Sequence, residues 1–332
     1  MYVTFQIHVI MFLFVILFLF LLSVAWLCHL IFIGPEHGTV IIHPVNLFGA
    51  SIIPIFVAWR SFSRKKLDLL GAIFAYFIGF TTFISNFSIF CSLMGFFFSS
   101  NIFTKWKSNR KAKQLADYET TGCRDSYQVL CNGAVVYVSC ILIAYECRMQ
   151  LRELSFMSQY SCTMYYLMSI SAISCSCGDT WASEIGTAIG SDTPRLVTSF
   201  RRVPAGTNGA VSLTGLIGSG VGGLFVGLCA LLSLGPQFWS ISTTFDLLLF
   251  CTLSGLIGSG IDSILGAMFQ YSGIDQRTMK VTNEPNLHAV HISGYPILSN
   301  NAVNVLTSVL TSFAVMPKLA VYLRLFNESH TF

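Results

Sequence analysis

Long apolar runs alternate with short polar connections along the whole chain. Each run is close to or above the roughly 18 to 20 residues with which a helix crosses a hydrocarbon core about 30 Å thick. The runs occupy residues 9–33, 40–59, 67–84, 86–101, 128–147, 160–177, 209–234, 244–270 and 302–325. The pattern predicts an all-α, polytopic transmembrane helical bundle with about eight or nine spans. We expect one integral membrane domain over 1–332, in which two N-terminal spans within 1–66 precede a core at 67–315.

The first run is expected to be an uncleaved helix. It is longer than the apolar core of a signal peptide, and no basic residue precedes it. The membrane assignment agrees with a composition that is 54% apolar and only 10% charged, since soluble domains carry roughly a quarter charged residues. The net charge of +4 lies in short segments beside apolar runs, which argues against nucleic acid as a partner.

Basic residues fix an expected orientation. They cluster after the second run (Arg60, Arg64, Lys65, Lys66) and after the fourth (Lys105, Lys107, Arg110, Lys111, Lys113), and the positive-inside rule puts such clusters in the cytoplasm. The N-terminus and the polar connections 102–127, 178–208 and 271–301 are then cytoplasmic. The C-terminus, with a glycosylation sequon at Asn327, is lumenal, which favours the endoplasmic reticulum or another internal membrane.

Most cysteines favour a reduced, buried state. They lie inside apolar runs, where a free thiol behaves as a small hydrophobe, and Cys175 and Cys177 lack a second pair at zinc-binding spacing. A short glycine-rich stretch, Gly215–Gly220, recurs as Gly255–Gly260. We favour helix packing over ligand contact for these glycines, because small residues let membrane helices approach closely.

The most unusual polar stretch, Gly178–Gly186, directly follows an apolar run and contains Asp179, Thr180 and Glu184. A carboxylate at membrane depth needs a partner or a function. Five helical residues turn about 500°, so the two acids would project roughly 140° apart and would not bind one ion together. The alternative is that Asp179 caps the start of a helix.

Two further motifs carry groups suited to phosphate and metal. Gly206, Thr207, Asn208 and Gly209 precede an apolar run, where helix N-terminal amides suit a phosphate, although Asn-Gly is also a common turn. Arg201 and Arg202 are positioned either to pair with phosphate or to anchor at headgroups. Asp262 lies inside a later run, and together with Asp179 it is our predicted Mg²⁺ ligand pair, since Mg²⁺ takes one or two carboxylates plus substrate oxygens.

Amides recur near the run ends, at Asn132 and at Asn300, Asn301 and Asn304. Hydrogen bonding between helices and ligand binding are equally good interpretations of them.

These motifs, in this order, resemble the transmembrane protein 19 family, multi-span membrane proteins catalogued as a domain of unknown function. The resemblance covers about Leu67 to Val315. It is carried by Thr104–Lys107, Cys131–Val135, Gly178–Glu184, Gly206–Gly209, Gln270–Gly273 and Asn300–Asn304.

One plant chloroplast member of that family is a phytyl-phosphate kinase, and the Gly-Asp-x-x-Ala-x-x-x-Gly pattern looks like one in CTP-using membrane enzymes such as dolichol kinase. The resemblance therefore implies phosphoryl transfer from CTP to an isoprenoid monophosphate. It implies catalytic roles for Asp179 and Glu184, with Asp179 and Asp262 on the metal. Nucleotide or phosphate contacts fall to Asn132, Gly178, Thr180, Gly206, Thr207, Asn208, Gly209, Asn300, Asn301 and Asn304.

The chain departs from the family pattern at three places. Ser299 stands where relatives usually have Asp, Tyr295 where Lys is common, and Ala210 where a second glycine follows the Thr-Asn motif. A weakened or inactive enzyme is expected if those groups bind metal or phosphate. Two other functions stay open: a membrane transporter, which would place both acids deep in the bilayer, and a noncatalytic multi-span protein.

Overall fold

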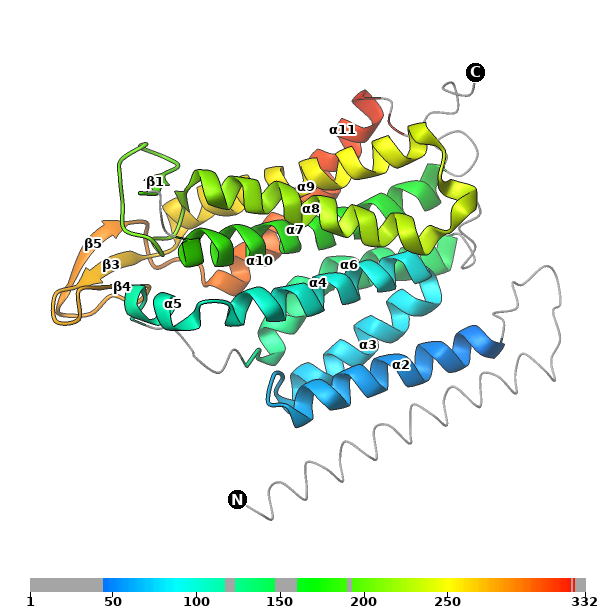
Figure 1. The fold of residues 1–332 in the computed structure, drawn as a ribbon, viewed down its shortest axis with the longest axis horizontal. Helices are drawn as coiled ribbons and strands as arrows, with labels where there is room; N and C mark the ends of the chain where they lie inside the picture. The colour runs from blue at the N-terminus through cyan, green and yellow to red at the C-terminus, as the bar shows by residue number, and fades with distance from the viewer. Residues whose placement is uncertain (1–43, 117–122, 147–159, 190–192, 324, 326–332) are drawn as a thin grey trace, which may run out of the picture.

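The computed structural model describes residues 44–116, 123–146, 160–189, 193–323 and 325. The predicted first span and Asn327 lie outside them. The helices are α2 (Pro44–Ser63), α3 (Leu69–Ser85), α4 (Phe87–Lys105), α5 (Ser108–Gln114), α6 (Ser126–Glu146), α7 (Tyr160–Ile189), α8 (Leu213–Leu234), α9 (Ile241–Phe269), α10 (Asn300–Val309) and α11 (Met316–Tyr322), with a π-helical segment, Leu310–Val315, joining the last two (Figure 1).

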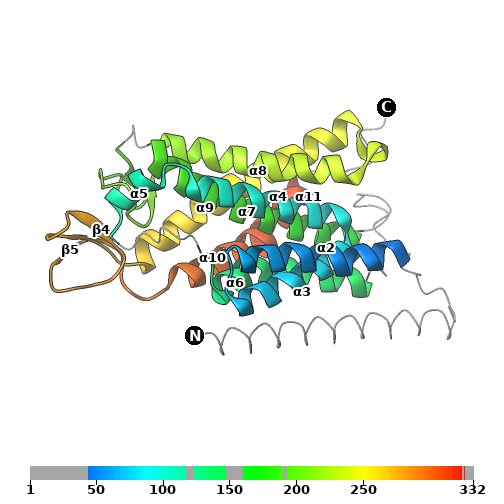
Figure 2. The ribbon, with the colours of Figure 1, turned by 60° about the horizontal axis from the view of Figure 1, so that its bottom comes forward.

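The described helices confirm a polytopic helical membrane protein. Six of them, counting Asn300–Tyr322 as one, are long and apolar enough to cross a membrane. The helix α3 is apolar but shorter, at 17 residues, and α7 is longer but more polar, at 30 residues. The pair α8 and α9 lies on the opposite side of the bundle from α2 and α3, with α4 and α7 between them (Figure 2).

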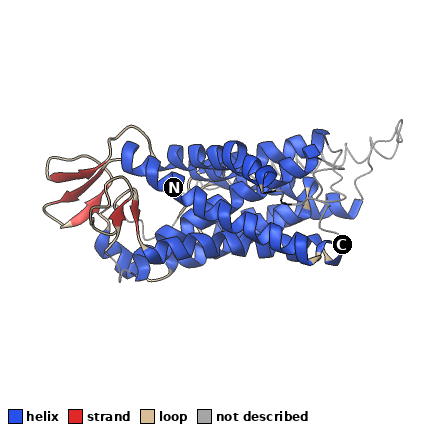
Figure 3. Ribbon diagram, turned by 90° about the horizontal axis from the view of Figure 1, so that it is seen from above, coloured by secondary structure: helices blue, strands red, loops and turns tan. Residues whose placement is uncertain are grey.

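Five short strands lie together at one end of the bundle, which we call the strand end (Figure 3). The strands β1 (Arg195–Leu196) and β2 (Ala210–Val211) pair antiparallel. The strands β3 (Ser272–Asp275), β4 (Lys280–Thr282) and β5 (Ala289–Ser293) form a second antiparallel sheet with β3 in the middle. The described parts of the connections that follow α7 and α9 therefore lie at the same end of the bundle (Figure 1).

One predicted boundary was wrong. We placed residues 178–208 in a connection, but α7 continues to Ile189, so the acidic motif is helical. Its polar residues face other helices and a cavity rather than lipid, which hydropathy along the chain does not reveal. The helix ends that were predicted well have local causes. Asn86, for example, ends α3 and caps α4 by accepting from the amide of Ser88 at 2.9 Å.

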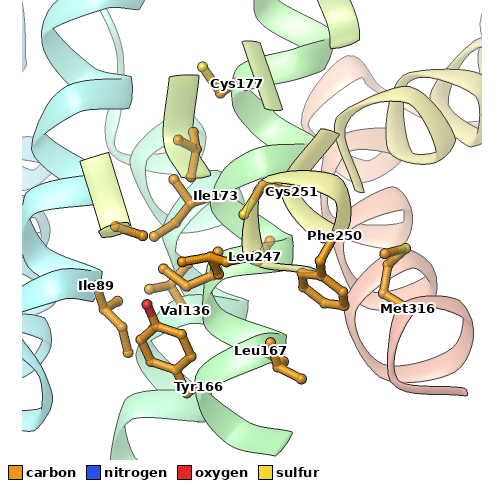
Figure 4. Packing of buried hydrophobic residues seen from close by; sticks show 14 of the residues in the cluster. Ile89, Val136, Tyr166, Leu167, Ile173, Cys177, Leu247, Phe250, Cys251 and Met316 are labelled. Atoms are coloured by element: carbon orange, nitrogen blue, oxygen red, sulfur yellow. The ribbon is translucent and has the colours of Figure 1, made fainter. Parts of the chain in front are cut away.

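The core lies around α7, whose apolar residues pack against α4, α6, α8 and α9 (Figure 4). Tyr166 is fully buried there, and its hydroxyl lies 2.9 Å from the Ser88 hydroxyl, which donates to the Ala230 carbonyl at 3.0 Å. A buried polar group costs free energy unless it is hydrogen-bonded. This short chain of bonds lets a tyrosine sit inside the membrane core.

Glycines bring α7, α8 and α9 into main-chain contact, as the packing interpretation expected. A Cβ on Gly178 would lie 2.7 Å from the Cα of Gly255 and 2.9 Å from the Ser219 carbonyl oxygen. On α8, Gly222 faces the Cys177 carbonyl of α7, whereas Gly223 faces the Cys251 carbonyl of α9. The repeated stretch is thus a contact between three helices.

Adding one methyl group at this contact should destabilise the fold. We expect Gly178→Ala to lower the free energy of unfolding by about 1–3 kcal/mol, because backbone atoms on both neighbouring helices must shift. Gly260→Ala is the matched control, since no atom lies within 4 Å of a Cβ there. Thermal unfolding in detergent measures both. Equal unfolding midpoints for the two variants would contradict the close contact.

Candidate functional site

A cavity of about 570 Å³ opens at the strand end among α6, α7, α9, α10 and the loops around the strands. We call it the polar cavity. Eleven of the residues proposed from the sequence line it: Asn132, Asp179, Thr180, Glu184, Gly206, Thr207, Asn208, Gly209, Asp262, Asn300 and Asn304. Two others do not. Gly178 packs against α8 and α9, and Asn301 is not among the lining residues.

Asp179 of α7 and Asp262 of α9, the acid pair, share this cavity and interact electrostatically. Ser259, on the same helix as Asp262, also lines the cavity. The carboxylate of Asp262 accepts from Thr307 Oγ1 at 3.4 Å, and the Asn304 amide, turned so that its nitrogen faces Asp262, donates at 3.3 Å. Two such carboxylates repel each other unless a cation or a proton lies between them. The helix-cap interpretation of Asp179 was wrong, because the residue lies well inside α7.

Glu184 faces a different partner, as its angular separation from Asp179 predicted. It forms an ion pair with Lys111 of α5. Lys111 is only 1% exposed and also donates to the carbonyls of Phe103 at 2.7 Å and Thr104 at 3.3 Å, in the last turn of α4. Lys111 therefore donates to carbonyl groups that the end of α4 leaves without a helical partner, and it also holds the Glu184 carboxylate of α7.

The Gly206–Gly209 motif is a turn rather than a helix N-terminus. Gly206 has φ of +93° and Gly209 of +75°, a region that favours glycine. The helix α8 begins only at Leu213 and is capped by Ser212.

Both the backbone and the side-chain amide of Asn208 donate hydrogen bonds to neighbouring residues of the protein. The backbone N–H donates to Ser272 Oγ at 2.9 Å, and the side chain donates to the Tyr271 carbonyl at 2.9 Å. The motif thus holds the turn against β3, and its role toward phosphate stays a prediction.

The positive charges at the polar cavity are not those that the sequence analysis singled out. Arg201 donates to the Ile292 carbonyl at 2.8 Å, and neither it nor Arg202 is among the lining residues. Lys111 and Arg124 line the cavity instead. In the sequence, Lys111 belongs to a basic cluster that indicates topology, and Arg124 belongs to none of the candidate motifs. Burial lowers the pKa of Arg124, while the nearby carboxylate of Glu184 acts in the opposite direction.

Of the three positions that depart from the family pattern, only Ala210 lines the polar cavity. Ser299 is the N-cap of α10, and its hydroxyl accepts from the Ala302 amide at 3.3 Å. Tyr295 is 67% exposed. Ala210 belongs to β2 and packs against Leu196, Val203 and Ala267. The cavity lining includes Ala210 but not Ser299 or Tyr295.

Serine and aspartate are equally good N-caps, which makes position 299 testable. We expect Ser299→Asp to change the free energy of unfolding and any activity very little, whereas Ser299→Ala should cost about 1 kcal/mol of stability through the lost cap. Unfolding in detergent and the transfer assay described below measure the two effects. A large gain of activity on Ser299→Asp would show that the missing carboxylate mattered chemically.

A bundle of apolar helices with an acid-lined polar cavity at its end defines a polytopic helical membrane protein. Residues 52–312 match the family described as integral membrane protein DUF92, and the chain belongs to that family. The resemblance found in the motifs is thereby confirmed.

Three relatives extend the comparison. Protein PGR of Arabidopsis thaliana is 35% identical over 281 residues, 81% of this chain and 94% of its own length. An uncharacterized membrane protein of Methanocaldococcus jannaschii is 29% identical over 69% of this chain and 86% of its own. Protein VTE6, chloroplastic, also of Arabidopsis thaliana, is 28% identical over 74% and 67%. No solved structure matches the chain.

Proposed function

We propose that this protein transfers a phosphoryl group from CTP to the phosphate of a membrane-embedded prenyl monophosphate. The observation that carries the proposal is the acid pair, brought from two helices into one polar cavity at the end of an apolar bundle. The motif resemblance to a family that includes a plant phytyl-phosphate kinase supports the same chemistry. It also supplies the choice of CTP, which the cavity itself does not specify.

The acid pair suits Mg²⁺. In the described part of the chain, no three His, Cys, Asp or Glu side chains gather into a group, so the donors on offer are two carboxylates. Mg²⁺ is usually held by one or two carboxylates together with water and phosphate oxygens. When bound, the ion would neutralise charge on the transferring phosphates. Asp179 and Asp262 would hold it, while Lys111 and Arg124 add positive charge at the cavity wall.

In the proposed reaction, an oxygen of the prenyl monophosphate attacks the terminal phosphorus of CTP. A phosphorus–oxygen bond forms, the anhydride bond to the neighbouring phosphate breaks, and CDP leaves with the bonding electrons. The acceptor is already an anion, so no strong base is required. Glu184 forms an ion pair with Lys111. Its role in the proposed reaction is to hold that lysine at the cavity wall, because the acceptor has no proton that must be removed.

The transporter alternative predicts the acids at the middle of the bilayer. Asp262 precedes the last residue of α9, Phe269, by two helical turns, which is about 10 Å along the axis. This position near the strand end favours an interfacial site. The repeated glycine stretch is accounted for by helix packing.

The proposed site faces the cytosol, as the basic clusters indicate. Cys162, at the opposite end of α7, is disulfide-bonded, which suits an oxidising compartment on that side. For this chain, the endoplasmic reticulum stays a prediction. The name of the relative VTE6 places that protein in the chloroplast. Membership of the family therefore does not by itself favour the endoplasmic reticulum.

The test uses the purified full chain in lipid nanodiscs, with CTP, Mg²⁺ and geranylgeranyl monophosphate. We expect CTP-dependent formation of the diphosphate, detected by thin-layer chromatography of radiolabelled lipid. Phytyl and farnesyl monophosphates serve as alternative acceptors, and ATP as an alternative donor. A folded protein that transfers phosphate to none of them contradicts the proposal.

A further inference from the structure

A second, smaller cavity adjoins the polar cavity. It has a volume of about 80 Å³ and lies among α2, α3, α4 and α6. Apart from the residues that it shares with the polar cavity, and Ser61, its walls are apolar or glycine, with side chains such as Val57, Ala75 and Phe97. We call it the apolar crevice. An apolar crevice beside a site for charged groups has the shape that an amphiphilic ligand requires.

Three polar residues, Arg124, Gln128 and Asn132, line both cavities. We call them the junction. They are spaced by four, so Gln128 and Asn132 lie on one face of α6, and Arg124 just precedes the first residue of that helix. Among the described residues, no atom accepts a hydrogen bond from the Arg124 guanidinium. The junction thus presents donors at the boundary between an apolar and a polar space.

The Arg124 guanidinium lines both cavities, and a phosphate is its best-matched partner because two N–H groups meet two oxygens. We propose that the apolar crevice holds the first units of a lipid chain whose monophosphate lies at the junction, bound by Arg124. The acceptor of the proposed transfer reaction would thereby enter from the α6 side of the cavity. This inference rests on the proposed function only for the identity of the lipid, not for its binding.

The small volume of the crevice has a consequence for specificity. It accommodates only the part of the chain nearest the phosphate, so the remainder must lie in the bilayer. Affinity should therefore depend on the phosphate and the proximal units, and little on total chain length.

The experiment measures equilibrium binding of radiolabelled geranylgeranyl monophosphate to the full chain in nanodiscs, without nucleotide. Val57→Phe fills the crevice and should weaken binding about tenfold or more. Ile53→Phe is its matched control, since Ile53 lies one turn earlier on α2, is 43% exposed and does not line the crevice. The shorter geranyl monophosphate should respond to Val57→Phe in the same way.

Arg124→Gln should weaken the binding of both monophosphates by roughly 10- to 100-fold, as expected for the loss of a charged hydrogen bond. The binding of geranylgeraniol, which lacks the phosphate, should be unchanged. A structural role would instead lower the unfolding midpoint. Because Arg124 has no hydrogen-bond partner among the described side chains, its replacement should not lower the unfolding midpoint.

Wild-type affinity in both Val57→Phe and Arg124→Gln overturns the inference. If lipid binds as expected but no diphosphate ever forms, the transfer proposal fails and the binding site stands.

Discussion

Replacing Asp179 by Asn is expected to slow phosphoryl transfer by about 10²- to 10³-fold while leaving the fold intact. The substitution keeps the size of the side chain but removes one charge of the acid pair. Loss of a charged group that stabilises a transition state typically lowers the rate by about 10²- to 10³-fold. Because the two acids repel each other, the variant should be at least as stable as the wild type without metal.

Two measurements separate a chemical role from a structural one. Transfer at increasing Mg²⁺ should show a weaker apparent metal affinity for Asp179→Asn, and thermal unfolding should show no loss. Asp275→Asn is the control, since Asp275 is a carboxylate at the strand end that accepts from the Arg277 amide at 2.8 Å and does not line the cavity. Full activity in Asp179→Asn contradicts the acid pair as the metal site.

Replacing Lys111 by Met should destabilise the protein more than any other single change considered above. The methionine fills a similar volume but leaves the Glu184 carboxylate and two carbonyls at the end of α4 without their donor. Breaking a buried ion pair costs about 3–5 kcal/mol, because the remaining charge is uncompensated. The unfolding midpoint in detergent is expected to fall accordingly.

Lys113→Met is the matched control, since this lysine lies on the same short helix and is exposed. The double variant Lys111→Met with Glu184→Gln should recover part of the loss, because the unpaired charge is gone. If Lys111→Met and Lys113→Met unfold alike, the ion pair contributes little to stability.

Hydropathy and turn residues predicted the six described helices that are long and apolar enough to cross a membrane, because lipid-facing segments must be apolar along most of their length. They failed for α7. Its second half carries Asp179 and Glu184 on faces that meet α9 and α5, not lipid. A one-dimensional pattern records how polar a residue is, but not which neighbour covers it.

The candidate site was predicted as a set of residues but not as a geometry. Polar residues inside apolar runs must be satisfied somewhere, so Asp179, Asp262 and Asn304 stood out, and they do meet. The roles of Lys111 and Arg124 at the cavity were missed because a cation in a polar connection between helices resembles a topology signal. The four-residue spacing of Arg124, Gln128 and Asn132 was the available indication that they share a face.

The main-chain contact at Gly178, Ser219 and Gly255 has a further consequence for the membrane in which the protein resides. Side chains do not set the separation of α7 and α9 at this level, so neither rotamer changes nor lipid-facing substitutions can alter it much. Bilayers differ in thickness, and helices usually adapt by tilting. Here α7, α8 and α9 would tilt as one body, so the helices that carry Asp179 and Asp262 would keep the same backbone separation at this level in a thin membrane as in a thick one.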